Sequence, residues 1–213
     1  MTTRVILVHG IWMPGAVMAW QAARLRAAGF ECETFSYYGV TRGPEEATAR
    51  ITDVLSRGEA HVVAHSLGGL VTLRALCARP SLPVRRVVCL GSPLRGSAAV
   101  RGMRRHSWAA ATLGLAADVL DRGFERWDGP AEVGVIAGSL PHGLGHVFSH
   151  FDEDHDGSVS VAETRLPGLA DHVVIRASHS GMLFSAEAAR LTVQFLREGR
   201  FGPVEASAAP PSG

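Results

Sequence analysis

Short apolar runs alternate with longer segments of helical spacing along this chain. The first run, VILVH at residues 5–9, is rich in β-branched residues and stops at Gly10, as a buried strand would. Similar runs follow, and between them apolar residues recur at a helical period. We predict strands over residues 5–9, 32–36, 61–64, 87–90, 133–136 and 172–177, and helices over 16–28, 44–55, 67–78 and 186–197.

The alternation of strands and helices predicts an α/β fold. Strands that are apolar on both faces are typical of a parallel sheet that helices cover on either side. We therefore expect a compact, doubly wound and mostly parallel six-stranded sheet in a single domain over residues 1–202, because 213 residues are enough for one well-buried core. Residues 203–213 (PVEASAAPPSG) have the composition of a disordered tail.

Two segments interrupt this alternation, and each follows a predicted strand at the edge where such folds place their sites. Residues 97–128 are rich in Ala and Leu, and their helical stretch either faces the core or forms a cap or flap. Residues 138–167 contain glycines, histidines and several acids. We expect this second segment to be a loop that carries an acidic functional residue.

Composition and charge narrow the classes of function. The formal net charge is +1, so no general attraction to nucleic acid or to an anionic membrane is expected. No stretch approaches the roughly 18 apolar residues of a membrane helix, which predicts no stable membrane insertion. The three cysteines show no metal-binding spacing, and a strand that starts near residue 4 leaves no room for a signal peptide. We expect a cytoplasmic protein without a cofactor.

The most informative stretch is HVVAHSLGGL at residues 61–70. A β-branched run ends at Ser66, and Gly68 and Gly69 open a helix, which is the strand, tight turn and helix of a nucleophile elbow. Ala64 stands where the elbow motif G-x-S-x-G has its first glycine. The alternative is that Ser66 only caps the helix that follows it, since serine is a preferred N-cap residue.

This A-H-S-x-G-G stretch resembles the α/β-hydrolase family, and in particular its small bacterial lipases. Two further stretches are similar to segments of these lipases, namely HG at the end of the first strand and SHSGMLFS at residues 178–185. The resemblance implies Ser66 as the nucleophile and His179 as the base, which must be a neutral imidazole to accept the hydroxyl proton. It further implies an oxyanion hole formed by the backbone N–H groups of Ile11 and Leu67.

Other residues close to these stretches are candidates for substrate contact. GSPLRGS at residues 91–97 is similar to a GTPxxGS turn of the same family, which shapes the acyl pocket. The residues that we expect to touch a substrate are Trp12, Ser92, Leu94 and Met182. His9 ends the first strand and His172 begins the last one, and we expect both to be structural.

The third member of the triad must lie between Ser66 and His179, because the family's order is serine, acid, histidine. The acidic loop lies in this interval, and Asp156 opens a D-G-x-V turn whose glycine allows a sharp bend. This turn resembles the acid turn of many such hydrolases, which implies that Asp156 orients the histidine. Asp154 and Asp152 are the alternatives.

The same loop has the spacing of a calcium-binding EF-hand loop, D-x-[DN]-x-[DN]-G-x5-E. Its ligands would be Asp152, Asp154, Asp156 and Glu163. The flanking sequence does not favour the two helices of an EF-hand, because Pro141 and three glycines precede the loop and Pro167 follows it. A calcium ion held by part of the loop stays an alternative to a site without metal. A second metal alternative rests on His142, His146, His150 and His155.

Together these features predict a serine hydrolase that cleaves carboxylic esters, a carboxylesterase or lipase, with a small-molecule ester as its substrate. A thioesterase, an amidase or an acyltransferase would use the same residues. A non-catalytic binding protein with this fold is the alternative from another class, and it predicts that the three triad groups are not within hydrogen-bond reach. A calcium-responsive protein is a third alternative. Nothing in the sequence indicates an oligomeric state.

Overall fold

The computed structural model describes residues 2–37, 43–98, 100, 116–141 and 154–204 of the chain. The strands are β1 (Arg4–Val8), β2 (Glu31–Phe35), β3 (Ala60–His65), β4 (Val84–Leu90), β5 (Glu132–Gly138) and β6 (Asp171–Ile175). The helices are η1 (Gly15–Met18), α1 (Ala19–Ala27), α2 (Gly43–Leu55), α3 (Leu67–Ala78), α6 (Ala117–Arg122), α7 (Val161–Thr164), η4 (Gly181–Phe184) and α8 (Ala186–Glu198), of which η1 and η4 are 3-10 helices. Every predicted strand and helix is present, with ends that differ by up to three residues.

The strands form one sheet in the order β2-β1-β3-β4-β5-β6, and all five neighbouring pairs are parallel. This arrangement confirms the predicted doubly wound α/β fold. The strand order reverses beside β1, because the chain first adds β2 on one side and then β3 on the other. The carboxyl ends of β1 and β3 therefore lie next to each other, which is the position where open α/β sheets bind their ligands.

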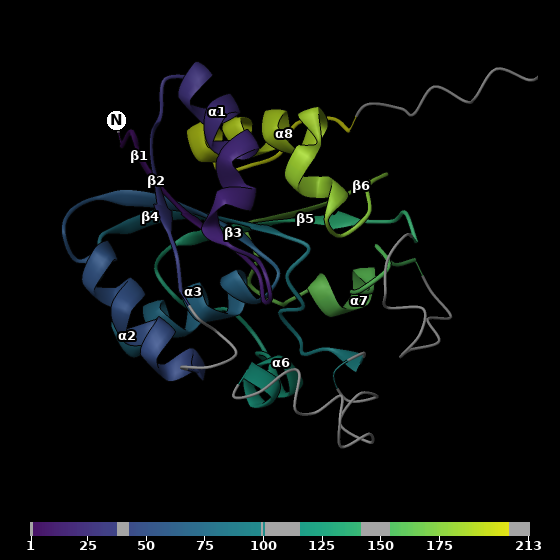
Figure 1. Cartoon of the computed structure of the whole chain (residues 1–213), viewed down its shortest axis with the longest axis horizontal. Helices are drawn as coiled ribbons and strands as arrows, with labels where there is room; N and C mark the ends of the chain where they lie inside the picture. Colours follow the sequence, from purple (N-terminus) through teal and green to yellow (C-terminus); the bar gives the residue numbers. More distant parts are fainter. Residues whose placement is uncertain (1, 38–42, 99, 101–115, 142–153, 205–213) are drawn as a thin grey trace, which may run out of the picture.

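Helices cover both faces of the sheet, with α1 and α8 on one face and α2, α3 and α6 on the other (Figure 1). Successive side chains of β1 point to opposite faces. Leu7 belongs to the buried cluster that contains Leu25 of α1 and Phe195 of α8. Ile6 belongs to the cluster that contains Ile51 of α2. Because each face is buried, the apolar residues of β1 are buried on both sides of the sheet, and each such side chain contributes about 1.5–3 kcal/mol to stability.

Helices α8 and α3 both have serine at the N-cap position, but only the serine of α8 makes a capping hydrogen bond. At α8, the side chain of Ser185 accepts a hydrogen bond from the N–H of Ala188 at 3.1 Å. At α3, Ser66 occupies the N-cap position but makes no side-chain capping hydrogen bond. This contradicts the alternative in which Ser66 only caps the helix, and leaves its hydroxyl available for another partner.

The two interrupting segments are only partly described. In the 97–128 segment α6 is described, whereas residue 99 and residues 101–115 lie outside the described part, so the prediction of a cap or flap does too. In the acidic loop, residues 142–153 lie outside it, as do residues 205–213 of the predicted tail. None of the helices in the described residues combines the length and the apolar composition needed to cross a bilayer.

Candidate active site

Ser66 lies in a strained turn between β3 and α3. Its backbone has φ 54° and ψ −124°, a region that non-glycine residues rarely occupy and that costs on the order of 1–3 kcal/mol. The turn is fixed on both sides, since the N–H of Ser66 donates to the carbonyl of Leu90 at 2.9 Å and its carbonyl accepts from the N–H of Gly69 at 3.1 Å. The strand, turn and helix of the predicted elbow are therefore present.

Two glycines allow the elbow to pack against the end of β1. A Cβ atom at Gly68 would lie 2.8 Å from the carbonyl oxygen of the last residue of β1. A Cβ atom at Gly10 would lie 3.0 Å from the Cβ of Ser66. The contact at Gly68 would be with backbone and the contacts at Gly10 with the buried side chains of His65 and Ser66, so a larger residue at either position would force the elbow and the end of β1 apart. The close approach brings the turn that carries Ile11 beside Ser66, and Leu67 follows directly as the first residue of α3.

His179 connects Ser66 to Asp156. Its Nε2 lies 3.0 Å from the Oγ of Ser66, and its Nδ1 lies 2.7 Å from Oδ2 of Asp156. An ionised carboxylate only accepts hydrogen bonds, so Nδ1 carries the hydrogen and Nε2 is left to accept the hydroxyl proton of Ser66. The backbone N–H of His179 also donates to the carbonyl of Asp156 at 2.9 Å. The three groups lie within hydrogen-bond reach, which the non-catalytic alternative did not predict.

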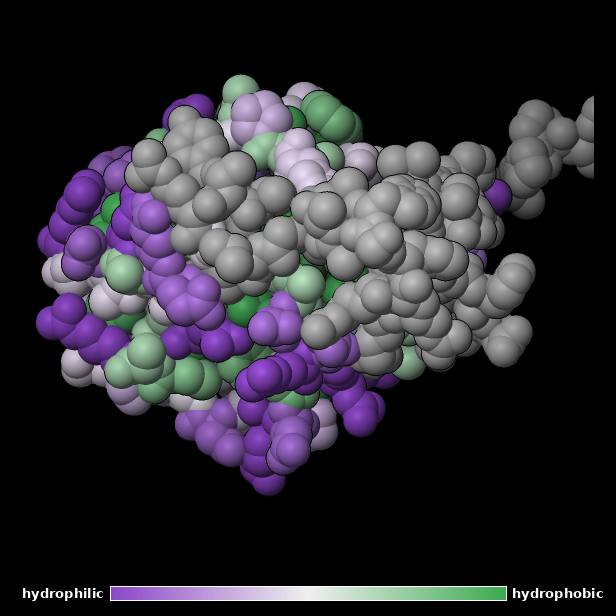
Figure 2. All heavy atoms as spheres, turned by 60° about the horizontal axis from the view of Figure 1, so that its bottom comes forward, coloured by the Kyte–Doolittle hydropathy of each residue, from purple (hydrophilic) through white to green (hydrophobic). Residues whose placement is uncertain are grey.

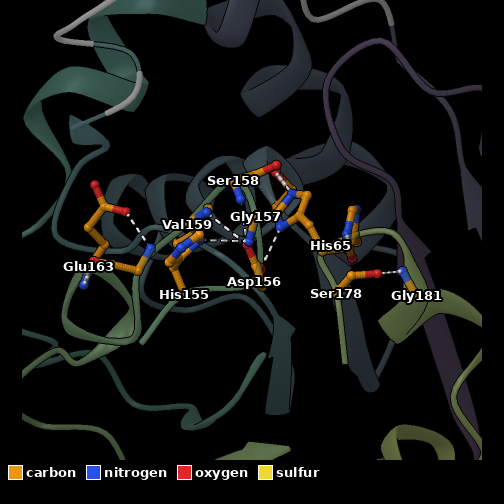
Figure 3. A network of polar contacts seen from close by, with 12 residues as sticks. His65, His155, Asp156, Gly157, Ser158, Val159, Glu163, Ser178 and Gly181 are labelled. Carbon is orange, nitrogen blue, oxygen red and sulfur yellow. Dashed lines mark hydrogen bonds and ion pairs between the residues drawn. The ribbon is translucent and has the colours of Figure 1, made fainter. Parts of the chain in front are cut away.

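The acid loop holds Asp156 in a buried position. The residue is 1% exposed, and Oδ1 accepts hydrogen bonds from the N–H groups of Ser158 at 2.9 Å and Val159 at 2.8 Å (Figure 3). Gly157, with φ 95°, makes the bend that turns these two amides back to the carboxylate. With His179 on the other oxygen, both carboxylate oxygens have partners, as a buried charge requires.

Gly91 is a residue of the site that sequence reasoning did not single out. It follows β4 with φ 56°, and a Cβ atom there would lie 3.0 Å from Oδ2 of Asp156 and 3.1 Å from Nδ1 of His179. The same atom would lie 2.6 Å from the end of the Met182 side chain. Only a residue without a side chain fits at this backbone conformation and distance. A glycine directly after a buried strand was the available signal, since it marks a close approach.

His9 and His172, which we predicted to be structural, both form hydrogen bonds to residues of neighbouring segments. His9 donates from Nδ1 to the carbonyl of Gly10 at 2.7 Å and accepts at Nε2 from the N–H of Tyr37 at 3.2 Å, and burial lowers its pKa. His172 lies 2.8 Å from the hydroxyl of Thr164, and burial lowers its pKa to about 4. Both side chains are thus neutral at pH 7 and tie neighbouring segments together.

Glu163, the last residue of the calcium-like spacing, forms the start of α7. The Oγ of Ser160 accepts from the N–H of Glu163 at 3.2 Å, and Oε2 of Glu163 accepts from the N–H of Ser160 at 2.8 Å. This is a capping box, in which side chain and backbone satisfy each other at a helix N-terminus. The other carboxylate oxygen accepts from the N–H of Ala98. The helix that begins here has four residues, too few for the second helix of an EF-hand.

Two of the remaining metal candidates, Asp154 and His155, lie in the described part of the chain. Asp154 is exposed, and Asp152 lies outside the described residues with His142, His146 and His150. His155 is buried, and its Nδ1 accepts from the N–H of Gly157 at 3.1 Å. In the part of the chain that the structure describes, no group of three or more Asp, Glu, His or Cys side chains is arranged to hold a metal ion.

The residues predicted to contact substrate differ in exposure. Trp12 follows Ile11 with φ 58°, and 58% of it is exposed. Ser92, Leu94 and Met182 have no exposed surface. Leu94 belongs to the buried cluster below the sheet and Met182 to the cluster on the opposite face. None of these three side chains reaches the surface in this structure, and their contact with a substrate stays a prediction.

A groove of about 880 Å³ lies between α2, α3 and α6. Leu70, Val119 and Phe124 are among its lining residues, whereas Ser66 and His179 are not. Figure 2 shows the side of the molecule that carries these helices, where hydrophobic atoms reach the surface between polar side chains. The groove holds none of the hydrogen-bonded groups described above, so we do not assign it to the active site.

The fold and the site define a class: a parallel α/β domain with a serine elbow, a histidine and an aspartate at the carboxyl edge of its sheet. A model of the alpha/beta hydrolase family matches residues 5–170. The chain belongs to this family of hydrolases, which confirms the resemblance found in the sequence. No curated protein matches the chain.

Solved structures share the fold. The lipase BlEst2 of Bacillus licheniformis in its mature form has a TM-score of 0.74 at 18% identity, over 92% of this chain and 91% of that one. A pyrethroid hydrolase from Sphingobium faniae JZ-2 has a TM-score of 0.65 at 16% identity, over 93% and 98%. The metagenomic carboxyl esterase MGS0156 has a TM-score of 0.62 at 19% identity, over 83% and 64%. At these identities the likeness is one of fold.

Proposed function

We propose that the chain is a serine hydrolase that cleaves carboxylic esters through an acyl-enzyme on Ser66. The observation that carries this proposal is the pair of contacts made by His179, 3.0 Å to Oγ of Ser66 and 2.7 Å to Oδ2 of Asp156. A hydroxyl becomes a nucleophile when a base lies about 2.6–3.2 Å away and a third group orients that base.

The contacts support a two-step reaction. In the first step the Oγ of Ser66 bonds to the ester carbonyl carbon while Nε2 of His179 takes the hydroxyl proton. The bond to the alcohol oxygen then breaks, and the same proton passes to the leaving alkoxide. In the second step water attacks the acyl-enzyme with His179 again as the base, which releases the carboxylic acid and restores Ser66. Asp156 accepts from Nδ1–H throughout and stabilises the imidazolium.

The oxyanion of each tetrahedral intermediate would accept hydrogen bonds from the backbone N–H groups of Ile11 and Leu67. Leu67 is the first residue of α3, so its N–H points away from the helix and carries part of the positive end of the helix dipole. Ile11 is adjacent because Gly10 packs on Ser66. Each such donor accelerates acyl transfer by about 10²–10³-fold.

The choice of ester as the substrate class rests on the structural neighbours, which include a lipase and a carboxyl esterase. The residues of the site would serve thioesters and amides in the same way. Trp12 is 58% exposed beside the oxyanion turn, which makes an apolar, uncharged ester the favoured small-molecule substrate.

Hydrolysis of p-nitrophenyl acetate, butyrate and laurate tests the proposal. We expect turnover by the wild-type chain and a loss of at least about 10⁴-fold in kcat for Ser66→Ala, because this change removes the hydroxyl that lies 3.0 Å from Nε2 of His179. Ser56→Ala, a change at an exposed serine next to α2, is the matched control and should keep full activity. Hydrolysis at the wild-type rate by Ser66→Ala would contradict the proposal.

A further inference from the structure

His65 precedes the nucleophile in the chain and its ring packs beside that of the base, and the mechanism above gives it no task. It is the last residue of β3 and is 1% exposed. Its Nε2 lies 3.0 Å from the backbone carbonyl of His179, and the two imidazole rings are 4.7 Å apart. Figure 3 shows His65 beside the turn that carries Ser178 and Gly181. His65 therefore joins the nucleophile strand to the loop of the base.

The direction of this hydrogen bond follows from its partner. A carbonyl oxygen only accepts, so Nε2 of His65 must carry the hydrogen. Burial, with a smaller effect from the charge of His179, lowers the pKa of His65 to about 3. The ring is thus neutral during catalysis, donates to the loop and does not compete with His179 for the proton of Ser66.

The other nitrogen of His65 has no compensating contact. Nδ1 is buried and has no hydrogen-bond partner among the described residues. A buried polar atom without a partner costs about 1–3 kcal/mol, which an apolar side chain of the same size would not. Histidine at this position is therefore not explained by stability, and the hydrogen bond made by Nε2 is the feature that an apolar residue would lack.

The ring also contacts the oxyanion turn. A Cβ atom at Gly10 would lie 2.9 Å from Nδ1 of His65, so the turn before Ile11 lies directly against the ring. His65 thus fills the space between two loops that must hold fixed positions relative to Ser66. One of them would supply an oxyanion donor, and the other supplies the base.

The loop of the base is held from two sides. The N–H of His179 donates to the carbonyl of Asp156 at 2.9 Å, and the carbonyl of His179 accepts from His65 at 3.0 Å. The first bond fixes the loop to the acid, and the second fixes it to the strand that ends at Ser66. Gln21 holds the loop further along, through the carbonyl of Met182 at 2.8 Å, but the second bond is the one that joins the backbone of His179 itself to the strand that ends at Ser66.

We propose that His65 is a positioning residue for the base, whose Nε2–H hydrogen bond to the carbonyl of His179 sets the distance between His179 and Ser66. The proposal rests on the catalytic role of the triad proposed above. A displacement of about 1 Å in a reacting group costs on the order of 10²-fold in rate. We expect a loss of this size in variants that cannot make the bond.

Three variants separate the hydrogen bond from packing. His65→Gln places its amide N–H₂ where Nε2 lies and keeps the donor, His65→Asn is polar but too short to reach the carbonyl, and His65→Leu is apolar. The matched control is His61→Leu. His61 lies on the same strand, is 2% exposed and has a pKa lowered to about 4 by burial, but it is four residues earlier, near the start of β3.

Two measurements are made on each folded variant. The first is the rate constant for labelling by a fluorophosphonate, in which a bond forms from the Oγ of Ser66 to phosphorus, fluoride leaves and His179 takes the hydroxyl proton. The second is the ¹H resonance of the short Nδ1–H···Oδ2 bond between His179 and Asp156, which lies far downfield and requires no turnover. Thermal unfolding reports the stability of each variant.

We expect His65→Asn and His65→Leu to lose about 10²-fold in the labelling rate and to show a broadened resonance. His65→Gln should keep the labelling rate and the resonance of the wild-type chain. His61→Leu should leave both signals unchanged. Wild-type labelling by His65→Asn, or equal losses in Gln and Asn, would overturn the proposal. If the wild-type chain is not labelled at all, the proposed function fails. In that case the positioning role of His65 is tested by the resonance alone, and an unbroadened resonance in His65→Asn would overturn it.

Discussion

Replacing Asp156 by Asn tests the orienting acid, because Asn keeps the size of the side chain and one of its two acceptor oxygens. Oδ1 of Asp156 accepts from the N–H groups of Ser158 and Val159 at 2.9 and 2.8 Å, so the amide oxygen of Asn must stay in this position. The NH₂ group then replaces Oδ2, 2.7 Å from Nδ1 of His179. An NH₂ group only donates, so the ring must carry its hydrogen on Nε2 instead.

This tautomer presents an N–H to the Oγ of Ser66, and His179 can no longer accept the hydroxyl proton. In a serine protease with intact geometry, the same tautomer lowers kcat by about 10⁴-fold. We expect a similar loss here, equivalent to about 5.5 kcal/mol of transition-state stabilisation at about 1.4 kcal/mol per tenfold. The free energy of unfolding should change little, because the buried N–H groups of Ser158 and Val159 keep their acceptor.

The assay is kcat and KM for p-nitrophenyl butyrate, with denaturant unfolding of each variant. The control is Asp154→Asn, which changes an exposed carboxylate two residues earlier and should leave kcat within about twofold. A kcat for Asp156→Asn within tenfold of wild type would refute the assignment. An equal loss in Asp154→Asn would refute it as well.

Three further predictions concern stability, packing and metal. Burial lowers the pKa of His61 to about 4 and that of His65 to about 3, so below pH 6.5 the unfolded chain binds protons that the folded chain does not. As the pH falls from 7.5 to 5, each histidine should therefore lower the free energy of unfolding, measured with urea, by up to about 2 kcal/mol. A free energy of unfolding that increases as the pH falls over this range would contradict the burial of these two histidines as neutral side chains. Gly91→Ala places a Cβ atom 3.0 Å from the acid and should lower kcat by about 10²-fold, whereas an unchanged kcat would show that the site tolerates the contact. Calcium and chelator should each leave the Tm unchanged, because the oxygens of Glu163 accept protein N–H groups; a rise in Tm with millimolar calcium would restore the calcium alternative.

The periodicity of the sequence predicted the sheet and its helices, because continuous apolar strands have few other solutions than a parallel sheet with both faces covered. Ser66 and His179 were named by the elbow motif and by the resemblance to lipases, and the fold brings them to one edge because residues that follow parallel strands meet there. Asp156 was harder to separate from Asp154. What distinguishes it is the bend at Gly157, which aims two backbone amides at one carboxylate and buries it.

Glu163 shows why the match to the spacing of a calcium-binding loop was partly misleading. Its spacing to the aspartates fits a calcium loop, yet S-x-x-E at Ser160 is also the signature of a capping box, and the structure contains that box. Gly91 and His65 were not predicted, because their importance lies in contacts between segments distant in the sequence, from β4 to the acid and from β3 to the base. Local patterns carry no information about such contacts.

The most direct test of the central claim is the position of a covalent adduct. We expect fluorophosphonate treatment to place one phosphonyl group on the peptide that contains Ser66, with ester hydrolysis lost in proportion to the fraction of chain labelled. His179→Ala should abolish the labelling, because its Nε2 lies 3.0 Å from the attacking oxygen. A label on another residue, or full ester turnover by chains whose Ser66 is blocked, would contradict the account.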